Sequence, residues 1–328
     1  MQISLVSACG ALGLGLVLLS GCSGDVSSEE DPVDDDEQAL TSGYRAQITT
    51  NPTRVLVGSP TALGVHVTGP RSIPVTQFDP LHTQPMHLIA VSSDLQDFIH
   101  IHPALQPTGD LTATATFARA EPYAIFMEYD PAGTPKQTLS RATVKPVGSQ
   151  LVAPQLSLAD AFGGASSKTV LAGATRVELV GTPGGMIMAD VPTHIVVRLR
   201  TASGAPINDL TDWLGMPAHA IIVSSDLKTF VHAHGMAESS GGAHAHGAAG
   251  STTTGPVGVD VTLPKAGLYK MFVQFKRGAT LITAPFVLNV MASHGPPPPP
   301  PSASCATMHC PSGQMCMVMG SPPAPMCM

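Results

Sequence analysis

The chain has 328 residues, which is enough for two ordinary domains and their connecting segments. Only 12% of the residues are charged, and 32 glycines and 31 prolines favour short strands joined by turns over helical bundles. The net charge of −7 comes mainly from one acidic stretch near the N-terminus, and the absence of a basic stripe excludes nucleic acid as a partner.

Residues 1–21 have the pattern of an export signal. The apolar run Ala11–Leu19 is too short to span a bilayer and ends in Leu-Ser-Gly-Cys, although no Lys or Arg precedes it. This tetrapeptide resembles the lipobox of bacterial lipoproteins, in which the cysteine is lipidated after cleavage. We therefore expect Cys22 to attach the protein to a membrane, with an ordinary secretory signal as the alternative. The acidic, Ser-rich residues 22–43 predict a disordered tether.

An internal repeat fills the middle of the chain. Residues 85–102 (PMHLIAVSSDLQDFIHIH) match residues 217–234 (PAHAIIVSSDLKTFVHAH) at 11 of 18 positions, with an offset of 132. Beyond this segment the copies realign at an offset of 146, so the second copy contains 14 additional residues within a His-rich insertion, 235–254. The predicted boundaries are 44–146 for the first copy, 147–169 for a linker and 170–292 for the second copy.

Each copy has the pattern of a β-domain. In the first copy, five segments are rich in β-branched or aromatic residues and are bounded by Pro, Gly, Asp and Ser. These segments are Thr61–Val67, Met86–Val91, Phe98–His102, Thr112–Phe117 and Tyr123–Tyr129. About seven such strands per copy predict an all-β fold of two tandem immunoglobulin-like β-sandwich domains, with a closed barrel as the alternative.

The repeated segment predicts a hairpin that gathers histidines. If Val91 pairs with Phe98 across the Ser-Ser-Asp-Leu turn, residues whose numbers sum to 189 face each other, and His87 lies opposite His102. His100 is two residues from His102 and therefore lies on the same face of the sheet. The same reasoning groups a second set in the second copy, namely His219, His232 and His234.

Three imidazoles on rigid strands suit a transition-metal ion. Imidazole binds copper, zinc and nickel, and the thioethers of the nearby Met86 and Met216 favour copper, with zinc as the alternative. The competing interpretation is structural, since buried histidines also bond to backbone carbonyls. Asp94 and Asp226 belong to the repeated turn and are expected to shape it rather than to bind metal.

The C-terminal region predicts a spacer and a small cross-linked tail. Residues 293–304 contain six consecutive prolines, which favour a stiff polyproline II segment. Residues 305–328 are rich in Met and Cys, and resemble small disulfide knots at the ends of myxobacterial exported proteins. Four cysteines in an exported chain predict two disulfides of undetermined connectivity: Cys305, Cys310, Cys316 and Cys327.

The hairpin also resembles a known family. The pattern M-H-L-I-x-V-S-x-D-L-x-x-F-x-H-x-H-P, which begins at Met86, and a later G-x-Y-x-x-F-x-Q-F, which begins at Gly267, resemble the exported bacterial YtkA-like domains. The layout is similar to that of CopC-type copper carriers. The resemblance spans both copies and implies β-sandwiches of a kind found among heavy-metal and copper-handling proteins. The sequence departs from the pattern at Ala218, Gly235 and Glu121, which replace its methionine, proline and glycine.

Taken together, these features predict a lipid-anchored protein of the bacterial cell envelope that binds copper for buffering, relay or resistance. Its expected partners are a membrane, the metal ion and a metal-transport system. Ser23 and Gly24 lack the aspartate associated with inner-membrane retention, which favours the outer membrane or a periplasmic face. No phosphate-binding loop, nucleophile elbow or catalytic carboxylate pair is present in the sequence, so we do not expect an enzyme. The alternative is a structural or adhesive surface lipoprotein that binds no metal.

Overall fold

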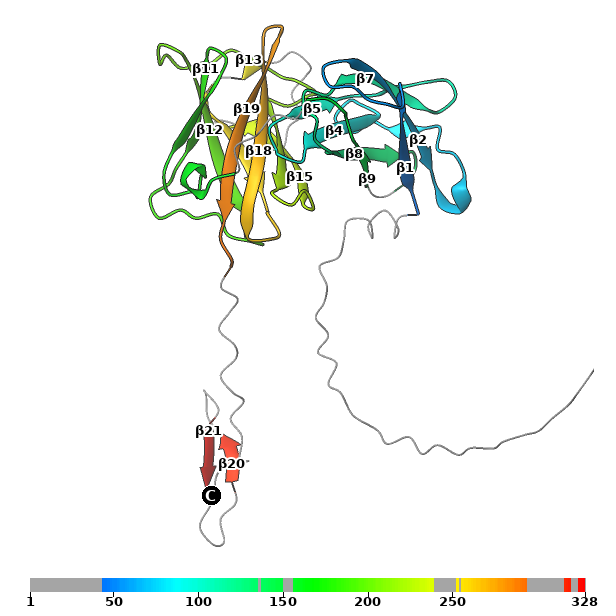
Figure 1. The fold of residues 1–328 in the computed structure, drawn as a ribbon. Helices are drawn as coiled ribbons and strands as arrows, with labels where there is room; N and C mark the ends of the chain where they lie inside the picture. The colour runs from blue at the N-terminus through cyan, green and yellow to red at the C-terminus, as the bar shows by residue number, and fades with distance from the viewer. Residues whose placement is uncertain are drawn as a thin grey trace, which may run out of the picture. The chain divides into compact units, whose positions relative to one another are not determined.

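The computed structural model describes residues 43–134, 137–149, 156–238, 252–253 and 255–293, together with the backbone of two strands near the C-terminus (Figure 1). These last strands are β20 (Cys316–Met319) and β21 (Ala324–Cys327), which pair antiparallel with Cys316 opposite Cys327. The predictions for the export signal, Cys22, the acidic tether, the proline spacer, Cys305, Cys310 and the inserted His244 and His246 lie outside the described residues.

The described residues form strands and two short 3-10 turns, η1 (Pro70–Ser72) and η2 (Leu158–Asp160). They include no helix of the length and hydropathy that a membrane crossing requires. The fold of the described part is all-β, as the composition predicts.

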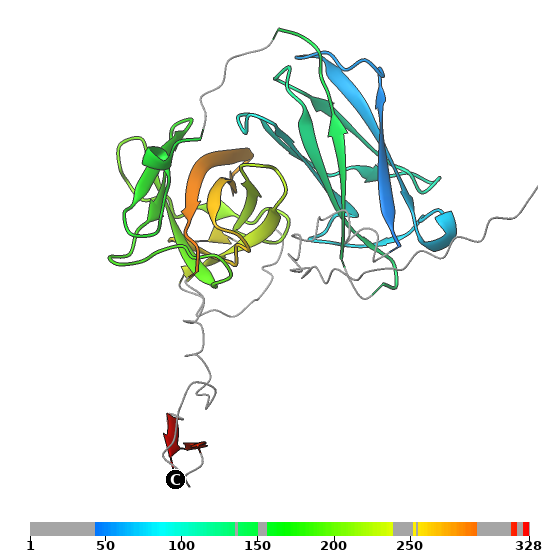
Figure 2. The ribbon, with the colours of Figure 1, turned by 60° about the horizontal axis from the view of Figure 1, so that its bottom comes forward.

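The described residues of the first copy form nine strands. They are β1 (Arg45–Asn51), β2 (Pro60–Thr68), β3 (Phe78–Asp79), β4 (Met86–Ser92), β5 (Phe98–Ile101), β6 (Ala104–Leu105), β7 (Leu111–Thr116), β8 (Tyr123–Pro131) and β9 (Thr138–Val144). All five segments predicted as strands are strands, to within two residues at each end. Figure 2 shows β1 and β2, in blue, within one layer of this copy.

These strands form two facing sheets. One sheet has the order β1-β2-β7-β6, and the other has the order β3-β8-β4-β5 with β9 also paired to β8. Apolar side chains from both sheets meet in one core, among them Leu63 and Val65 from β2, Leu88 from β4 and Ile125 from β8. The first copy is therefore a β-sandwich.

The second copy repeats this plan with two additional edge strands, β10 and β16, and a longer loop. Its strands are β10 (Lys168–Ala172), β11 (Thr175–Val180), β12 (Thr193–Thr201), β13 (Leu210–Thr211), β14 (Ala218–Ser224), β15 (Phe230–Ala237), β16 (Thr252–Thr253), β17 (Val257–Val261), β18 (Gly267–Arg277) and β19 (Thr280–Val290). They follow the order β10-β11-β12-β17-β15-β14-β18-β13-β16, with β19 paired to β18. Strands β14 and β18 are equivalent to β4 and β8 in the first copy.

One substitution explains why the sheets are separate in the first copy and continuous in the second. Pro103 lies between β5 and β6, and because proline has no backbone N–H it ends one strand before the next begins. Strand β5 therefore pairs with β4, and β6 pairs with β7 of the other sheet. The residue equivalent to Pro103 is Gly235, which lies inside the uninterrupted strand β15 and pairs with Val259 of β17. Strand β15 therefore pairs with β14 and then with β17, and so joins the two sheets of the second copy.

In both sandwiches, a tyrosine at the start of β8 or β18 bonds to the backbone of the preceding loop. The hydroxyl of Tyr123, at the start of β8, accepts a hydrogen bond from the backbone N–H of Arg119 at 3.0 Å. The hydroxyl of Tyr269, at the start of β18, donates to the backbone carbonyl of Lys265 at 2.8 Å. A tyrosine that bonds a few residues upstream at this strand is a hallmark of immunoglobulin-like sandwiches. With the strand orders above, it makes both copies immunoglobulin-like.

Part of the stretch expected to be a linker, residues 147–169, belongs to the second sandwich. Phe162 is buried in the core of that copy. Its backbone N–H donates to Val287 and its carbonyl accepts from Asn289, so it forms a parallel bridge beside β19. The repeat comparison did not include this segment, because the predicted second copy begins at residue 170.

Strands β4 and β14 are buried on both faces. In β4, Met86, Leu88 and Ala90 face the sandwich core, whereas Ile89 and Val91 belong to a separate apolar cluster. That cluster also contains Ile221 and Val223 of β14, together with Leu95, Phe126 and Phe272. The outer faces of the β4 and β14 sheets therefore pack on each other, and His87 and His219 lie on these faces.

Two reciprocal aromatic stacks hold the copies together. Phe98 stacks on Phe272 with ring centroids 4.3 Å apart. Phe126 stacks on Phe230 at 4.6 Å. Phe98 and Phe230 are equivalent by the offset of 132, and Phe126 and Phe272 by the offset of 146. In each stack, a phenylalanine from the hairpin of one copy contacts a phenylalanine from β8 or β18 of the other copy. The interface therefore has an approximate twofold symmetry.

We predict that Phe126→Ala lowers the free energy of unfolding by about 3–5 kcal/mol, because a fully buried ring is removed from the contact between the copies. Urea denaturation measures this change. A double-mutant cycle with Phe230→Ala should give a coupling of about 0.5–1.5 kcal/mol. Additive single losses would mean that the two rings do not contact each other in solution.

Candidate metal site at the contact between the two copies

The first histidine cluster consists of His87, His100 and His102. The strand register is the predicted one, with Leu88 paired to Ile101 and Ile89 paired to His100. One ring nitrogen from each histidine lies within 4.8 Å of one nitrogen of each of the others. His87 is fully buried, and His100 and His102 are partly buried. The predicted convergence of the three imidazoles in this copy is therefore present in the structure.

The hydrogen-bond partners of this cluster determine which nitrogens carry protons. Nε2 of His87 lies 2.9 Å from the carbonyl oxygen of Leu81, and a carbonyl can only accept, so Nε2 bears the hydrogen. Nδ1 of His100 lies 2.7 Å from Oε1 of Gln274 and by the same argument bears its hydrogen. The amide of Gln274 is oriented by its own Nε2, which donates to Thr283 at 3.1 Å.

In the neutral rings, the two remaining nitrogens have lone pairs and no hydrogen. Nδ1 of His87 and Nε2 of His100 face each other at 3.1 Å. Nε2 of His102 is buried and forms no hydrogen bond within the described residues. Two lone pairs at this distance repel each other unless a proton or a metal cation lies between them.

The second histidine cluster, His219, His232 and His234, repeats this arrangement. The ring nitrogens again lie within 4.8 Å of one another. Nε2 of His219 donates to the carbonyl of Trp213 at 2.9 Å, and Nδ1 of His219 faces Nε2 of His232 at 3.1 Å. Both clusters therefore place a pair of imidazole nitrogens in the same orientation.

Each cluster is completed by a residue of the other copy. Nδ1 of His232 lies 2.6 Å from Oε2 of Glu128, on β8 of the first copy. His100 has the equivalent partner in Gln274, on β18 of the second copy. Sequence reasoning treated the copies separately and did not identify Glu128. The sequence feature that could have identified it is a polar residue at equivalent positions of two mostly apolar strands, Glu128 in the first copy and Gln274 in the second.

Two further aromatic residues bring the clusters together. His82 belongs to the first copy, yet its ring centroid lies 3.9 Å from that of His234 in the second. Trp213 belongs to the second copy and lies 5.3 Å from His100 and 5.8 Å from His102. The repeat comparison could not find His82, because the equivalent residue is Leu214. His82 and the two clusters thus gather where the two sandwiches meet.

A cavity of about 430 Å³ gives access to the second cluster. Its walls include His82, His232 and His234 together with Met216 and Met236. Met216 therefore lies beside the predicted ligands, and Met236 adds a second thioether. The cavity therefore offers an ion a path from solvent to the histidines in its wall.

Met86 does not lie where the metal-site prediction requires. It is fully buried in the core of the first sandwich, on the face of β4 opposite His87. The error has a simple cause, since adjacent residues of a strand point to opposite faces. Met86 should therefore be removed from the candidate ligands.

Burial keeps these imidazoles neutral. Burial, together with the smaller effect of neighbouring histidines, lowers the pKa of His87, His100, His102 and His232 to about 3. Burial likewise lowers the pKa of His219. The carboxyl of Glu128 behaves in the opposite way, because burial raises its pKa to about 7. The metal-free clusters are thus poor proton acceptors near neutral pH.

The repeated aspartates have the predicted structural role. Asp94 accepts hydrogen bonds from Ser92 and from the backbone N–H of Gln96. Asp226 accepts from Ser224 and from the backbone N–H of Lys228. These bonds support turns in which Leu95 and Leu227 have positive φ values of 59° and 61°. Both carboxylates are committed to the hairpin turn.

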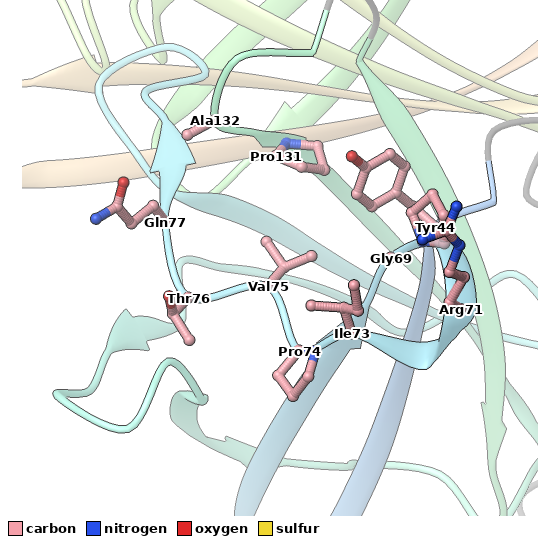
Figure 3. A pocket seen from close by; sticks show the side chains of 11 residues that line it. Tyr44, Gly69, Arg71, Ile73, Pro74, Val75, Thr76, Gln77, Pro131 and Ala132 are labelled. Atoms are coloured by element: carbon pink, nitrogen blue, oxygen red, sulfur yellow. The ribbon is translucent and has the colours of Figure 1, made fainter.

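A second cavity, of about 480 Å³, lies on the first sandwich near η1. Figure 3 shows Tyr44, Ile73, Val75 and Pro131 around it. Among the described residues that line this cavity there is no histidine, cysteine or carboxylate. It therefore lacks the ligands that a transition-metal site needs.

Comparisons with known proteins identify a domain family. The family model described as Domain of unknown function (DUF8832) matches residues 39–146 and 170–292. No curated protein sequence matches the chain. The family description names no metal, so the resemblance to YtkA-like and CopC-type domains stays a prediction.

Several solved structures are distantly similar. The Escherichia coli adhesin FdeC is 15% identical, with 76% of this chain and 65% of FdeC covered and a TM-score of 0.23. The Yersinia pseudotuberculosis adhesin InvE is 13% identical, with 76% and 61% covered and a TM-score of 0.20. The ICAM-5 D1–D4 fragment is 14% identical, with 76% and 54% covered and a TM-score of 0.19. The chain thus matches less than two thirds of each, and these values assign it no function.

We predict that the metal-free protein loses stability as the pH falls below about 6.5. The folded-state pKa of His87, His100 and His102 is about 3, against 6.5 in the unfolded chain. Between these values the unfolded chain binds more protons, so acid favours unfolding. Glu128 has the opposite effect, because its pKa is raised from 4.5 to about 7 and the folded chain therefore binds more protons in that range. The effect of this one carboxyl group is smaller than the combined effect of the buried histidines.

Urea unfolding in a chelator at several pH values measures the effect. His102→Gln should flatten the profile, whereas the same change at His66, which is 47% exposed, should not. A profile that is level from pH 7 to pH 5 would contradict the burial of the neutral imidazoles.

Proposed function

We propose that this chain, which belongs to the DUF8832 family, binds transition-metal ions in its two histidine clusters and prefers copper. The observation that supports the proposal most directly is the pair of facing imidazole nitrogens, 3.1 Å apart in each cluster. Their partners on the far side of each ring hold the tautomers that leave these nitrogens without hydrogen. Acceptors of this kind orient metal-binding histidines in many proteins.

The spacing of the facing nitrogens suits a transition-metal ion. Histidine nitrogens bind Zn(II) at about 2.0–2.1 Å, so two nitrogens 3.1 Å apart would subtend an angle of about 100° at such an ion. The third nitrogen lies within 4.8 Å, and a shift on the order of 1 Å would bring it into the same coordination sphere. The clusters could thus bind an ion with little movement of the strands.

Copper is preferred for two reasons. Among divalent first-row ions, Cu(II) forms the most stable complexes with nitrogen ligands, and those of Zn(II) are weaker. The thioethers of Met216 and Met236 line the cavity at the second cluster and are ligands that select Cu(I). The role consistent with such sites is to buffer or relay copper, and we expect no enzymatic reaction.

The expected location is the bacterial cell envelope, through a lipid on Cys22. Two or more acyl chains would suffice for stable anchoring. Expression in a bacterium, followed by membrane fractionation and labelling with a fatty acid, tests this step. The native chain should partition with membranes and carry label, and Cys22→Ala should do neither. Label on the Cys22→Ala chain would place the anchor elsewhere.

The metal proposal predicts two ions per chain in isothermal titrations with Cu(II) and with Zn(II), and tighter binding of Cu(II). Changing His100, His102, His232 and His234 to Ala should abolish binding. His66→Ala with His194→Ala provides a matched control, because these histidines lie outside both clusters and pair with carboxylates.

Trp213 offers an independent readout. It is the only tryptophan of the chain, and its ring lies 5.0 Å from that of His219 and 5.3 Å from that of His100. Cu(II) binding should quench its fluorescence in the native chain and the control, but not in the four-histidine variant. Equal quenching in all three would reject the proposal and leave the structural or adhesive surface lipoprotein as the alternative.

A further inference from the structure

The contact between the two copies is approximately symmetric, but the groups that accept hydrogen bonds from its buried histidines differ at one pair of positions. Glu128 and Gln274 are equivalent by the offset of 146, and each accepts a hydrogen bond from a histidine of the opposite copy. The aromatic stacks and the facing imidazoles are matched on the two sides. His82 and Trp213 have no aromatic counterparts, since the equivalent residues are Leu214 and Leu81. The acceptor is a carboxyl group behind the second cluster and a neutral amide behind the first.

Glu128 is held as firmly as its counterpart. Its side chain is 7% exposed, and that of His232 is 3% exposed. Oε2 accepts from His232 at 2.6 Å and Oε1 accepts from Gln137 at 2.9 Å. The carboxyl group therefore faces one ring of the cluster directly and is shielded from solvent.

A buried anion on the far side of a ligand ring changes what the cluster can bind. A carboxylate that accepts the Nδ1 hydrogen makes the opposite nitrogen of the imidazole more basic and offsets part of the charge of the ion. An amide in the same place holds the ring but supplies no charge. The two clusters therefore offer equivalent sets of three histidines in different electrostatic surroundings.

We propose that the second cluster is the tighter site for divalent ions and fills first, and that the identity of residues 128 and 274 sets this order. Glu128 and Gln274 are positioning residues, since each acts through a histidine of the other copy. The proposal rests on the proposed metal-binding function. It adds that each site depends on a residue from the opposite copy.

Exchange of the two acceptors tests the proposal. Zn(II) titrations at about pH 8, where carboxylates are ionised, would compare the native chain with Glu128→Gln, Gln274→Glu and the double exchange. His234→Gln and His102→Gln, each combined with these changes, would assign every binding step to one cluster. The amide introduced by Glu128→Gln retains an oxygen that can accept from His232, so the ring orientation is preserved.

Glu128→Gln should weaken the second cluster by about 10–100-fold and leave the first almost unchanged. Gln274→Glu should tighten the first cluster, and the double exchange should reverse the order of filling. A merely structural role of Glu128 would not produce this reversal. If Glu128→Gln does not fold, as judged by circular dichroism, Gln274→Glu alone decides the question.

The outcomes separate the two proposals. Two bound ions with affinities that none of the exchanges alters would overturn this inference and leave the metal-binding function intact. A native chain that binds no Zn(II) and no Cu(II) would overturn both. Filling of the first cluster before the second in the native chain would also contradict the assignment.

Discussion

The packing of two sheet faces on each other is the interaction on which the candidate site depends. Each face has apolar side chains at one end, such as Ile89 and Phe126, and histidines at the other. Contact between the apolar ends removes the histidines from solvent, and this burial lowers their pKa. Without the contact, the histidines would be ordinary residues on the surface of a sheet.

The same contact supplies the partners that orient the rings. In metal proteins a carboxylate, carbonyl or water behind a ligand histidine fixes the orientation of its ring. Here the corresponding group behind each of two histidines comes from the neighbouring copy. His100 depends on Gln274, and His232 depends on Glu128. Docking of the copies and preparation of the histidine clusters are therefore a single structural event.

Much of the local structure could be predicted from the sequence. The period of two along the strands and the length of the Ser-Ser-Asp-Leu turn determine the register that places His87 near His100 and His102. The same period should have excluded Met86, because it precedes His87 directly and must point the other way. The immunoglobulin-like fold was also accessible, from the number and spacing of the strands.

The meeting of the two copies was harder to predict. A continuous apolar run such as Leu88–Val91 indicates burial on both faces, but not what covers the second face. His82 illustrates the difficulty, because it has no counterpart in the second copy and reaches the second cluster only through the fold. Glu128 and Gln274 occupy equivalent positions but are different residue types, so a comparison of the two copies that counts only identical residues does not find them.

The covalent connection between the copies has a consequence for dilute conditions. Two separate sandwiches with these faces would associate only when concentrated, whereas one chain presents each face to the other at an effective concentration in the millimolar range. A modest patch of apolar contacts then suffices to keep the faces together, however scarce the molecule is. Because both copies lie in one chain, their association is intramolecular and does not depend on the protein concentration. The histidine clusters therefore assemble even when the protein is scarce.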